Sequence, residues 1–151
     1  MENQKSQETE LIERLLGRKP QGEYEVAVRG EDGSPRVLKN APFLDDGTPM
    51  PTLYWLVDPV DKRRISQLES SGAIGVAEAE IGLEEIELAH TKYQQERNSM
   101  IPEEYVGPMP SGGVGGTRVG IKCLHAHYAW FLAGGEDPVG NWVDQKLETE
   151  G

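Results

Sequence analysis

The segment from Gly112 to Gly135 constrains the fold of this chain more than any other. It begins with a glycine-dense stretch and continues into Ile121 to Ala133, which carries almost no charge. A helix over Ile121 to Ala133 would be apolar nearly all round, and such helices are normally buried on several sides. We therefore expect the other elements to pack around this helix.

The length of 151 residues predicts a single domain over 1–151 with a core of its own. One cysteine excludes an internal disulfide, which favours a cytoplasmic location. The first ten residues, MENQKSQETE, lack the apolar centre of a signal peptide. The longest apolar run, Cys123 to Ala133, is too short and too polar to span a bilayer.

The formal net charge of −11 is unevenly distributed along the chain. Residues 78–104 contain eight acids and two bases, whereas residues 105–135 contain no acid and two bases, Arg118 and Lys122. An acidic chain of this kind is not expected to bind nucleic acid or an anionic membrane, because both require basic surfaces. The one locally positive region coincides with the glycine-rich stretch.

The first half of the chain shows helix and strand patterns in turn. Residues 1–7 are polar, and we expect them to be disordered. Leu11, Ile12, Leu15 and Leu16 share one face of a helix predicted over Glu8 to Leu16. Short apolar or alternating runs predict three strands, at Tyr24 to Arg29, Arg36 to Lys39 and Leu53 to Val57.

The second half is mainly helical by pattern. Asp58-Pro59 has the composition of a helix start, and that helix should end at Gly72. Longer helices are predicted over Gly82 to Ser99 and Ile121 to Ala133, followed by a short tail with a helical turn near Trp142. Residues 105–120 form a glycine-rich loop. The predicted fold class is α+β, with a small, mainly antiparallel sheet of about three strands covered by three to four helices.

The glycine-rich loop suggests an anion site. Glycines let backbone N–H groups converge on a ligand, and the start of the next helix adds positive potential. Arg118 could form two hydrogen bonds with a phosphate or carboxylate, and Lys122 adds a second charge. The alternative is a flexible loop with a surface arginine. The predicted ligand-binding residues are Gly113, Gly115, Gly116, Thr117, Arg118, Lys122 and Arg97.

The segment after the loop holds the only cysteine and two of the three histidines. Cys123 and His127 are four residues apart, so on a regular helix both could reach one metal ion. His125 would then point about 200° away from Cys123, because successive helix residues are about 100° apart. Cys123 could also be a nucleophile, with its pKa lowered by the helix N-terminus and Lys122. The alternative is a buried thiol with hydrogen-bonded histidines.

A further row of polar residues lies on the helix predicted over Gly82 to Ser99. His90, Tyr93 and Arg97 share one face, where they could bind an anion or relay a proton. They could equally be polar side chains at the edge of the core. The candidate catalytic residues are His90, Tyr93, Cys123 and His125.

Four pieces of the chain resemble an actinobacterial family of uncharacterised proteins, the domain-of-unknown-function family numbered 501. They are DGTPMPTLYWLVDP (46–59), ISQLESSG (65–72), AHTKYQQER (89–97) and GGVGGTRVGIKCLHAHYAWFLAGGEDPVGN (112–141). The resemblance implies a bacterial cytoplasmic protein, whose gene often lies beside those of a septum-formation initiator and an exopolyphosphatase. Many members carry a cysteine pair where this chain has Arg29 to Gly33, which disfavours a metal site that uses this hairpin.

Three functions are compatible with these patterns. The first is binding of a small phosphate- or carboxylate-bearing ligand by the glycine-rich loop and Arg118; if the protein is an enzyme, it is a hydrolase or transferase acting on a phosphorylated metabolite. The second is a non-catalytic adaptor whose acidic helices bind a protein partner, with a possible link to cell division. The third is a metalloprotein centred on Cys123 and His127. The sequence identifies no cofactor.

Overall fold

The computed structural model describes residues 2–150 and confirms an α+β fold. The described chain contains a three-stranded antiparallel sheet and six α-helices, more helices than the three to four expected. The elements are α1 (Glu2–Leu16), β1 (Tyr24–Arg29), β2 (Pro35–Asn40), β3 (Tyr54–Leu56), α2 (Pro59–Ser70), α3 (Ala73–Ile81), α4 (Leu83–Asn98), the 3-10 turn η1 (Val114–Gly116), α5 (Leu124–Leu132) and α6 (Pro138–Glu150).

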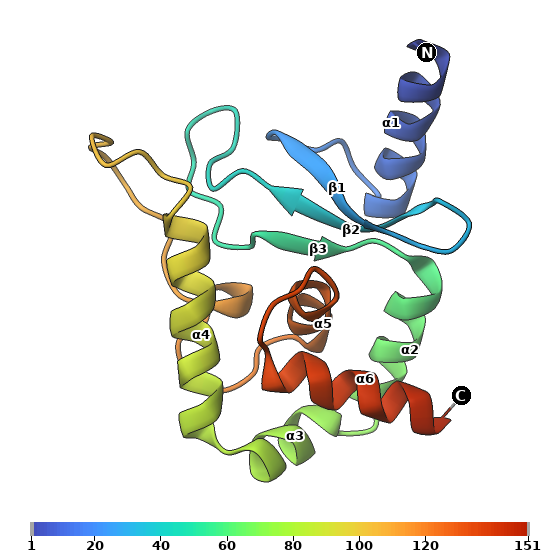
Figure 1. Cartoon of the computed structure of the whole chain (residues 1–151), viewed down its shortest axis with the longest axis vertical. Coiled ribbons are helices and arrows are strands. Elements are labelled where there is room, and N and C mark those ends of the chain that lie inside the picture. The colour runs from blue at the N-terminus through green and yellow to red at the C-terminus, as the bar shows by residue number, and fades with distance from the viewer. Residues whose placement is uncertain (1, 151) are drawn as a thin grey trace.

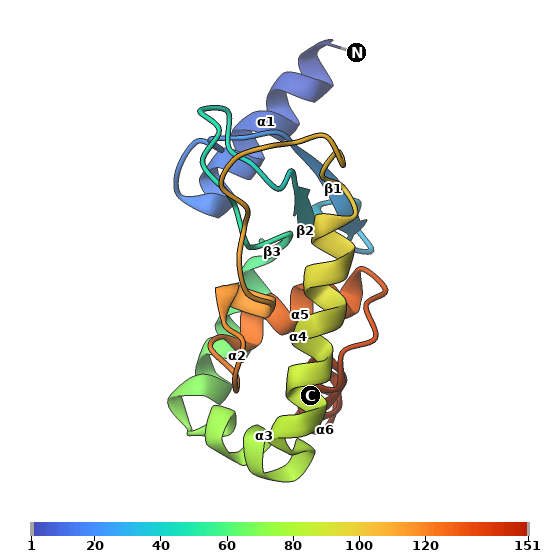
Figure 2. The ribbon, with the colours of Figure 1, turned by 90° about the vertical axis from the view of Figure 1, so that its left-hand side faces the viewer.

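The sheet separates two apolar cores. Its strands pair in the order β1-β2-β3, and neighbouring residues of a strand point to opposite faces. Val37 and Leu56 contribute to the larger core beside α2–α6, whereas Leu38 and Val57 pack with Ile12 of α1. Figures 1 and 2 show α1 on one side of the sheet and the other helices on the opposite side.

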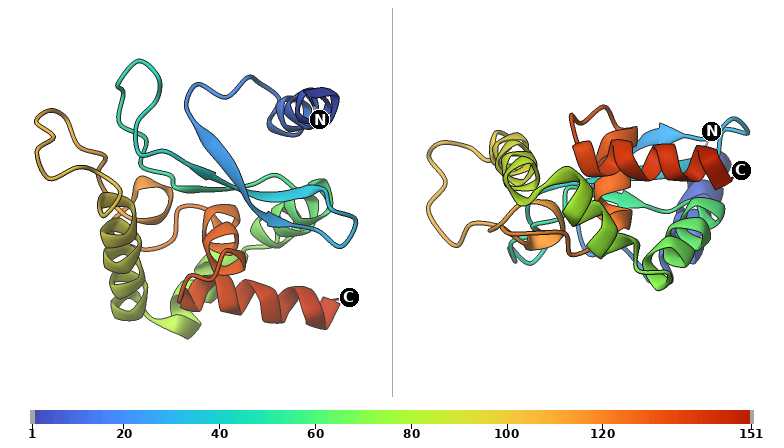
Figure 3. Two further views of the ribbon diagram at one scale, coloured as in Figure 1. Left: turned by 45° about the horizontal axis from the view of Figure 1, so that its top comes forward. Right: turned by 90° about the horizontal axis from the view of Figure 1, so that it is seen from below.

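Helix α5 lies at the centre of the helical side, as its apolar composition predicts. It packs against β3 and against α6, and Leu124 and Ala129 are fully buried. Figure 3 shows α5 between the sheet and α6, with α4 along one edge of the molecule. This arrangement places the first residues of α5 beside β3 and the end of α2.

Three helix predictions need correction. The predicted helix over Ile121 to Ala133 is shorter than expected, because Cys123 has an extended backbone (φ −153°, ψ 122°) and α5 begins at Leu124. Helix α3 was not predicted; Gly72 and Gly82, with φ of +87° and +93°, separate it from α2 and α4. The tail forms the full helix α6, which buries Val139, Val143 and Leu147 at a spacing of four residues.

The start of α2 was predicted correctly. Asp58 is its N-cap, and the carboxylate of Asp58 accepts a hydrogen bond from the Asp61 amide. Helix α1 begins at Glu2, earlier than the predicted start at Glu8. Within residues 2–150, none of the helices combines the length and apolarity that a membrane span requires.

Candidate functional site

Cys123 and His125 lie side by side at the start of α5. The Cys123 Sγ atom is 3.6 Å from the His125 Nδ1 atom, so the prediction that His125 points away from Cys123 is wrong. The helical spacing rule does not apply to this pair, because Cys123 precedes the helix as its N-cap in an extended conformation. The cysteine therefore meets the histidine two residues later rather than His127.

The orientation of the His125 ring is fixed by α2. Its Nε2 atom lies 3.1 Å from the Lys62 carbonyl oxygen and 3.1 Å from the Ser66 hydroxyl. A carbonyl only accepts hydrogen bonds, so we assign the ring hydrogen to Nε2. The Nδ1 atom faces Cys123 and also Glu69, whose Oε1 atom is 3.3 Å away. Nδ1 accepts from the Cys123 thiol when the ring is neutral and donates to the thiolate when the ring is protonated.

The pair is electrostatically coupled. Burial alone would raise the pKa of the Cys123 thiol, but hydrogen bonds from His125 and from the Ala126 amide outweigh it and lower the pKa. The hydrogen bond to Cys123 is the main cause that raises the pKa of His125, against the opposing effect of burial. The arrangement makes Cys123 easier to ionise than a free cysteine.

Glu69 is a site residue that the sequence analysis missed. It lies in the last turn of α2, and its Oε2 atom accepts a hydrogen bond of 2.9 Å from the Leu124 amide. A signal existed in the sequence: cysteine is not among the preferred N-cap residues, so the first amides of α5 require an acceptor from elsewhere. Glu69 in the ISQLESSG piece supplies this acceptor from 55 positions earlier in the sequence, a separation that no local pattern spans.

Cys123 and His125 form part of the wall of a pocket of about 390 Å³ between α1, β3 and α5. We call it the Cys123 pocket. Tyr54, Trp55, Leu56 and Ala126 give it aromatic and apolar surfaces. A larger hollow of about 570 Å³ lies beside the end of α1, but its wall comes from residues 10–19 alone and contains no cysteine or histidine.

Two cationic side chains also line the Cys123 pocket. Arg18 follows α1 and lies 5.4 Å from the Trp55 ring centre, and Lys122 directly precedes Cys123. Among the described residues, neither cation has a carboxylate partner, and none of the described residues that line the pocket is acidic. The pocket is thus locally positive in an acidic protein.

The glycine-rich loop is held together by its own backbone. The Gly113 amide donates to the Thr117 carbonyl, and the Gly116 amide donates to the Gly113 carbonyl. A Cβ atom at Gly113 would lie 2.4 Å from the His90 Cβ, so only glycine allows this approach of the loop to α4. Packing against His90 explains this glycine without a ligand.

The predicted ligand-binding residues are divided by the fold. Gly115 and Lys122 line the Cys123 pocket, whereas the Thr117 amide donates to the Val114 carbonyl. Arg118 is exposed and does not line the Cys123 pocket. Arg97 is fully buried and donates to the carbonyl oxygens of Pro51, Pro110 and Gly112. The structure therefore does not bring this set together around one ligand.

The row of His90, Tyr93 and Arg97 on α4 packs inside the protein. The Tyr93 hydroxyl accepts hydrogen bonds from the amides of Leu53 and Tyr54. The His90 Nε2 atom is 2.7 Å from the Gly120 carbonyl oxygen, and its Nδ1 atom accepts from the Val114 amide. These side chains connect α4 to β3 and to the glycine-rich loop, as the alternative reading of the row predicts.

His127, the predicted metal partner of Cys123, pairs with Asp137 in the structure, and the metal pair stays a prediction. The His127 Nδ1 atom is 2.7 Å from the Asp137 Oδ2 atom, and both side chains are completely buried. A different set of three side chains, which includes Cys123, could hold a metal ion. Donor atoms of Glu69, Cys123 and His125 all lie within 4.8 Å of one another. We call these three residues the Glu69–Cys123–His125 cluster.

Comparison with known proteins gave one match. A family model described as "Protein of unknown function (DUF501)" matches residues 26–145, from β1 to α6. No curated protein and no solved structure matches the chain.

Proposed function

Since this chain belongs to the DUF501 family, whose description names no activity, we propose from the geometry that it binds a small phosphate- or carboxylate-bearing ligand in the Cys123 pocket. Arg18 and Lys122 would bind the anionic group. Tyr54 and Trp55 would contact the rest of the ligand. The observation that carries this proposal is that one pocket is lined by two cations without a carboxylate partner among the described residues.

The charge of the protein makes this observation informative. With 26 acidic and 15 basic residues, a cation has many carboxylates available as partners. Arg36 and Lys92, for example, form ion pairs with Asp61 and Glu136. Arg18 and Lys122 lack such partners among the described residues, and an anionic ligand would supply the missing charge.

The shape of the pocket indicates the size of the ligand. A volume of about 390 Å³ lies within the range of small-molecule sites. The Trp55 ring and the apolar side chains of Leu56 and Ala126 suit a planar or apolar group. We therefore expect a ligand with its charge at one end and an apolar body.

This proposal moves the predicted anion site from the glycine-rich loop to the neighbouring Cys123 pocket. It retains Lys122 and Gly115 but replaces Arg118 by Arg18, because the glycine-rich loop uses several of its amides internally. The cytoplasmic location, the actinobacterial origin and the possible hydrolase or transferase activity remain parts of the proposal. The single cysteine supports the cytoplasmic location, and the four pieces that resemble the family support the actinobacterial origin.

Isothermal titration calorimetry with three probes tests the site. Phenyl phosphate and benzoate carry an anionic group on an aromatic ring, and benzyl alcohol is the neutral control. We expect the two anions to bind more tightly than benzyl alcohol. The double variant Arg18→Gln/Lys122→Gln should weaken their binding about tenfold or more, since hydrogen bonds to charged groups contribute about 1.5–3 kcal/mol.

Arg118→Gln provides the matched control, because it removes one exposed positive charge outside the pocket. It should leave the affinity for both anions unchanged. If Arg118→Gln weakens binding and the double variant does not, the ligand lies at the glycine-rich loop and the pocket proposal is wrong. Equal affinity for benzyl alcohol and the two anions would also contradict it.

A further inference from the structure

We propose that the Glu69–Cys123–His125 cluster binds a zinc-class divalent cation, with a fourth coordination position open to the Cys123 pocket. The three residues offer one carboxylate oxygen, one sulfur and one imidazole nitrogen. Thiolate and imidazole ligands favour zinc over magnesium or calcium, which prefer oxygen ligands.

Two of the donor distances within the cluster fit tetrahedral coordination, and the third, from sulfur to carboxylate oxygen, is within 4.8 Å. Zinc binds sulfur at about 2.3 Å and nitrogen or oxygen at about 2.0–2.1 Å, so neighbouring ligand atoms lie roughly 3.3–3.7 Å apart. The Cys123 Sγ and His125 Nδ1 atoms are 3.6 Å apart, and the His125 Nδ1 and Glu69 Oε1 atoms are 3.3 Å apart. One cation could therefore contact all three donors with small side-chain movements.

In two of the three residues, the side-chain atom that would not bind the metal already has a hydrogen-bond partner. The His125 Nε2 atom is held by the Lys62 carbonyl, and the Glu69 Oε2 atom accepts from the Leu124 amide. Histidine ligands of metals commonly donate their second ring N–H to such a carbonyl, which fixes the ring orientation. The remaining atoms, Nδ1 and Oε1, face each other and the thiol.

The open position follows from the place of the cluster in the fold. Cys123 and His125 line the Cys123 pocket, whereas Glu69 approaches from α2. Zinc sites with three protein ligands keep a position for water or substrate. This step rests on the proposed function: an oxygen of the anionic ligand would occupy the open coordination position. Arg18 and Lys122 would contact the same anionic group.

The test uses the full chain after dialysis against a chelator. Zinc is titrated against a chromogenic competitor, and cobalt is added in a parallel experiment. We expect one equivalent of either metal to bind, with a thiolate-to-cobalt charge-transfer band in the near ultraviolet. Failure of wild-type protein to bind one equivalent, or binding without that band, would overturn the proposal.

Variants assign the ligands. Cys123→Ser, His125→Gln and Glu69→Gln should each lower zinc affinity at least tenfold, while Glu87→Gln on the exposed face of α4 should not. Urea denaturation of the metal-free variants checks that each is folded. If a variant does not fold, the cobalt spectrum of the wild-type protein is the test of whether the metal binds the cysteine. Unchanged zinc affinity in folded Glu69→Gln and Cys123→Ser would mean an adventitious ion elsewhere and would contradict the site.

These experiments test the metal-site proposal and the anion-site proposal independently. Zinc is titrated without any anion, so loss of phenyl phosphate binding in the Arg18 and Lys122 variant leaves the metal result intact. Calorimetry of phenyl phosphate with zinc-loaded and metal-free protein tests the fourth position. We expect tighter binding to the zinc-loaded form, and equal affinities would exclude coordination of the ligand by the metal.

Discussion

His90 is a titratable side chain that the fold holds in its neutral form. It is only 3% exposed, and burial is the main cause that lowers its pKa below the usual 6.5. The titratable groups near it are His127, Asp137 and Glu87. Its two ring nitrogens connect α4 to Gly120 and Val114, so the neutral ring links the glycine-rich loop to the helix.

The pH dependence of the unfolding free energy should show that His90 is neutral in the folded protein. The unfolded chain binds a proton at His90 more strongly than the folded chain, because the folded pKa is lowered. The contribution of His90 to the unfolding free energy is therefore complete above its pKa in the unfolded chain, about 6.5. This contribution is lost as the pH falls through the lower pKa of His90 in the folded protein. Urea denaturation should show wild type losing more unfolding free energy than His90→Gln between about pH 7.5 and about pH 5.5.

Glutamine is chosen because its amide can still donate to the Gly120 carbonyl and does not titrate in this range. Parallel pH profiles for the two proteins would show that His90 does not contribute to the acid sensitivity. A steeper profile for His90→Gln than for wild type would reverse the sign of the argument and contradict the neutral assignment.

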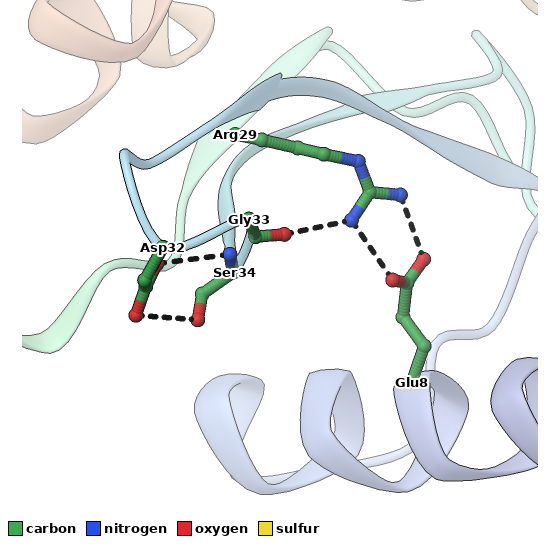
Figure 4. Close-up of polar contacts among 5 residues, drawn as sticks. All are labelled: Glu8, Arg29, Asp32, Gly33 and Ser34. Carbon is green, nitrogen blue, oxygen red and sulfur yellow. Dashed lines mark hydrogen bonds and ion pairs between the residues drawn. The ribbon is translucent and has the colours of Figure 1, made fainter.

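Helix α1 is attached to the sheet by two kinds of contact. Ile12 is 1% exposed and packs against Leu38 and Val57. Glu8 forms two hydrogen bonds of 2.9 and 3.0 Å with Arg29 (Figure 4), but the two side chains remain 37% and 48% exposed. Exposed ion pairs contribute little because water screens them, so the apolar contact should dominate.

Two substitutions on α1 separate these contributions. Ile12→Ala should lower the unfolding free energy by about 2–4 kcal/mol through loss of buried surface and the cavity left behind. Glu8→Gln should change it by less than about 1 kcal/mol. Urea denaturation of both variants measures the difference. A larger effect of Glu8→Gln than of Ile12→Ala would show that the ion pair, not the apolar contact, holds α1.

Strands and helix starts with local signals were predictable from the sequence. Tyr24–Arg29 alternates side chains as a half-buried strand does, and Asp58-Pro59 contains its own cap. Helix α3 was missed because the pattern of 73–81 shows no polar face, and only the backbone angles of Gly72 and Gly82 separate it from its neighbours.

The candidate site was predictable in part. Cys123, His125 and Lys122 were found because uncommon residues concentrate near 123. Their geometry was not, since it depends on α5 starting three residues later than its apolar pattern suggests. Glu69 and Arg18 reach the site only through tertiary packing of α2 and of the segment after α1, which sequence spacing does not encode.

At the scale of the whole molecule, the Cys123 pocket is built from residues inside the family match and from residues before it. The family match covers residues 26–145, whereas Leu16 and Arg18 of the Cys123 pocket lie before it. The Glu69–Cys123–His125 cluster lies inside the matched region. If the proposals are correct, the metal ligands belong to the family region and one of the two anion-binding cations belongs to the segment before it.

The net charge of −11 should also affect the stability of the molecule. Like charges repel more strongly in the compact state than in the expanded chain. Among residues 7–149, whose side chains the structure describes, the ion pairs between Lys or Arg and a carboxylate are Arg29–Glu8, Arg36–Asp61 and Lys92–Glu136. Few attractive pairs therefore offset the repulsion, and added salt should screen mainly the unfavourable interactions.

Thermal unfolding at increasing NaCl tests this balance. We expect Tm to rise by about 2–4 °C between roughly 0.02 and 0.2 M NaCl, which corresponds to about 1 kcal/mol for a protein of this size. Glu103→Gln/Glu104→Gln removes two exposed negative charges from the loop after α4. This variant should be more stable than wild type at low salt and should respond less to NaCl. A Tm that falls as NaCl is added would mean that the attractive pairs outweigh the repulsion.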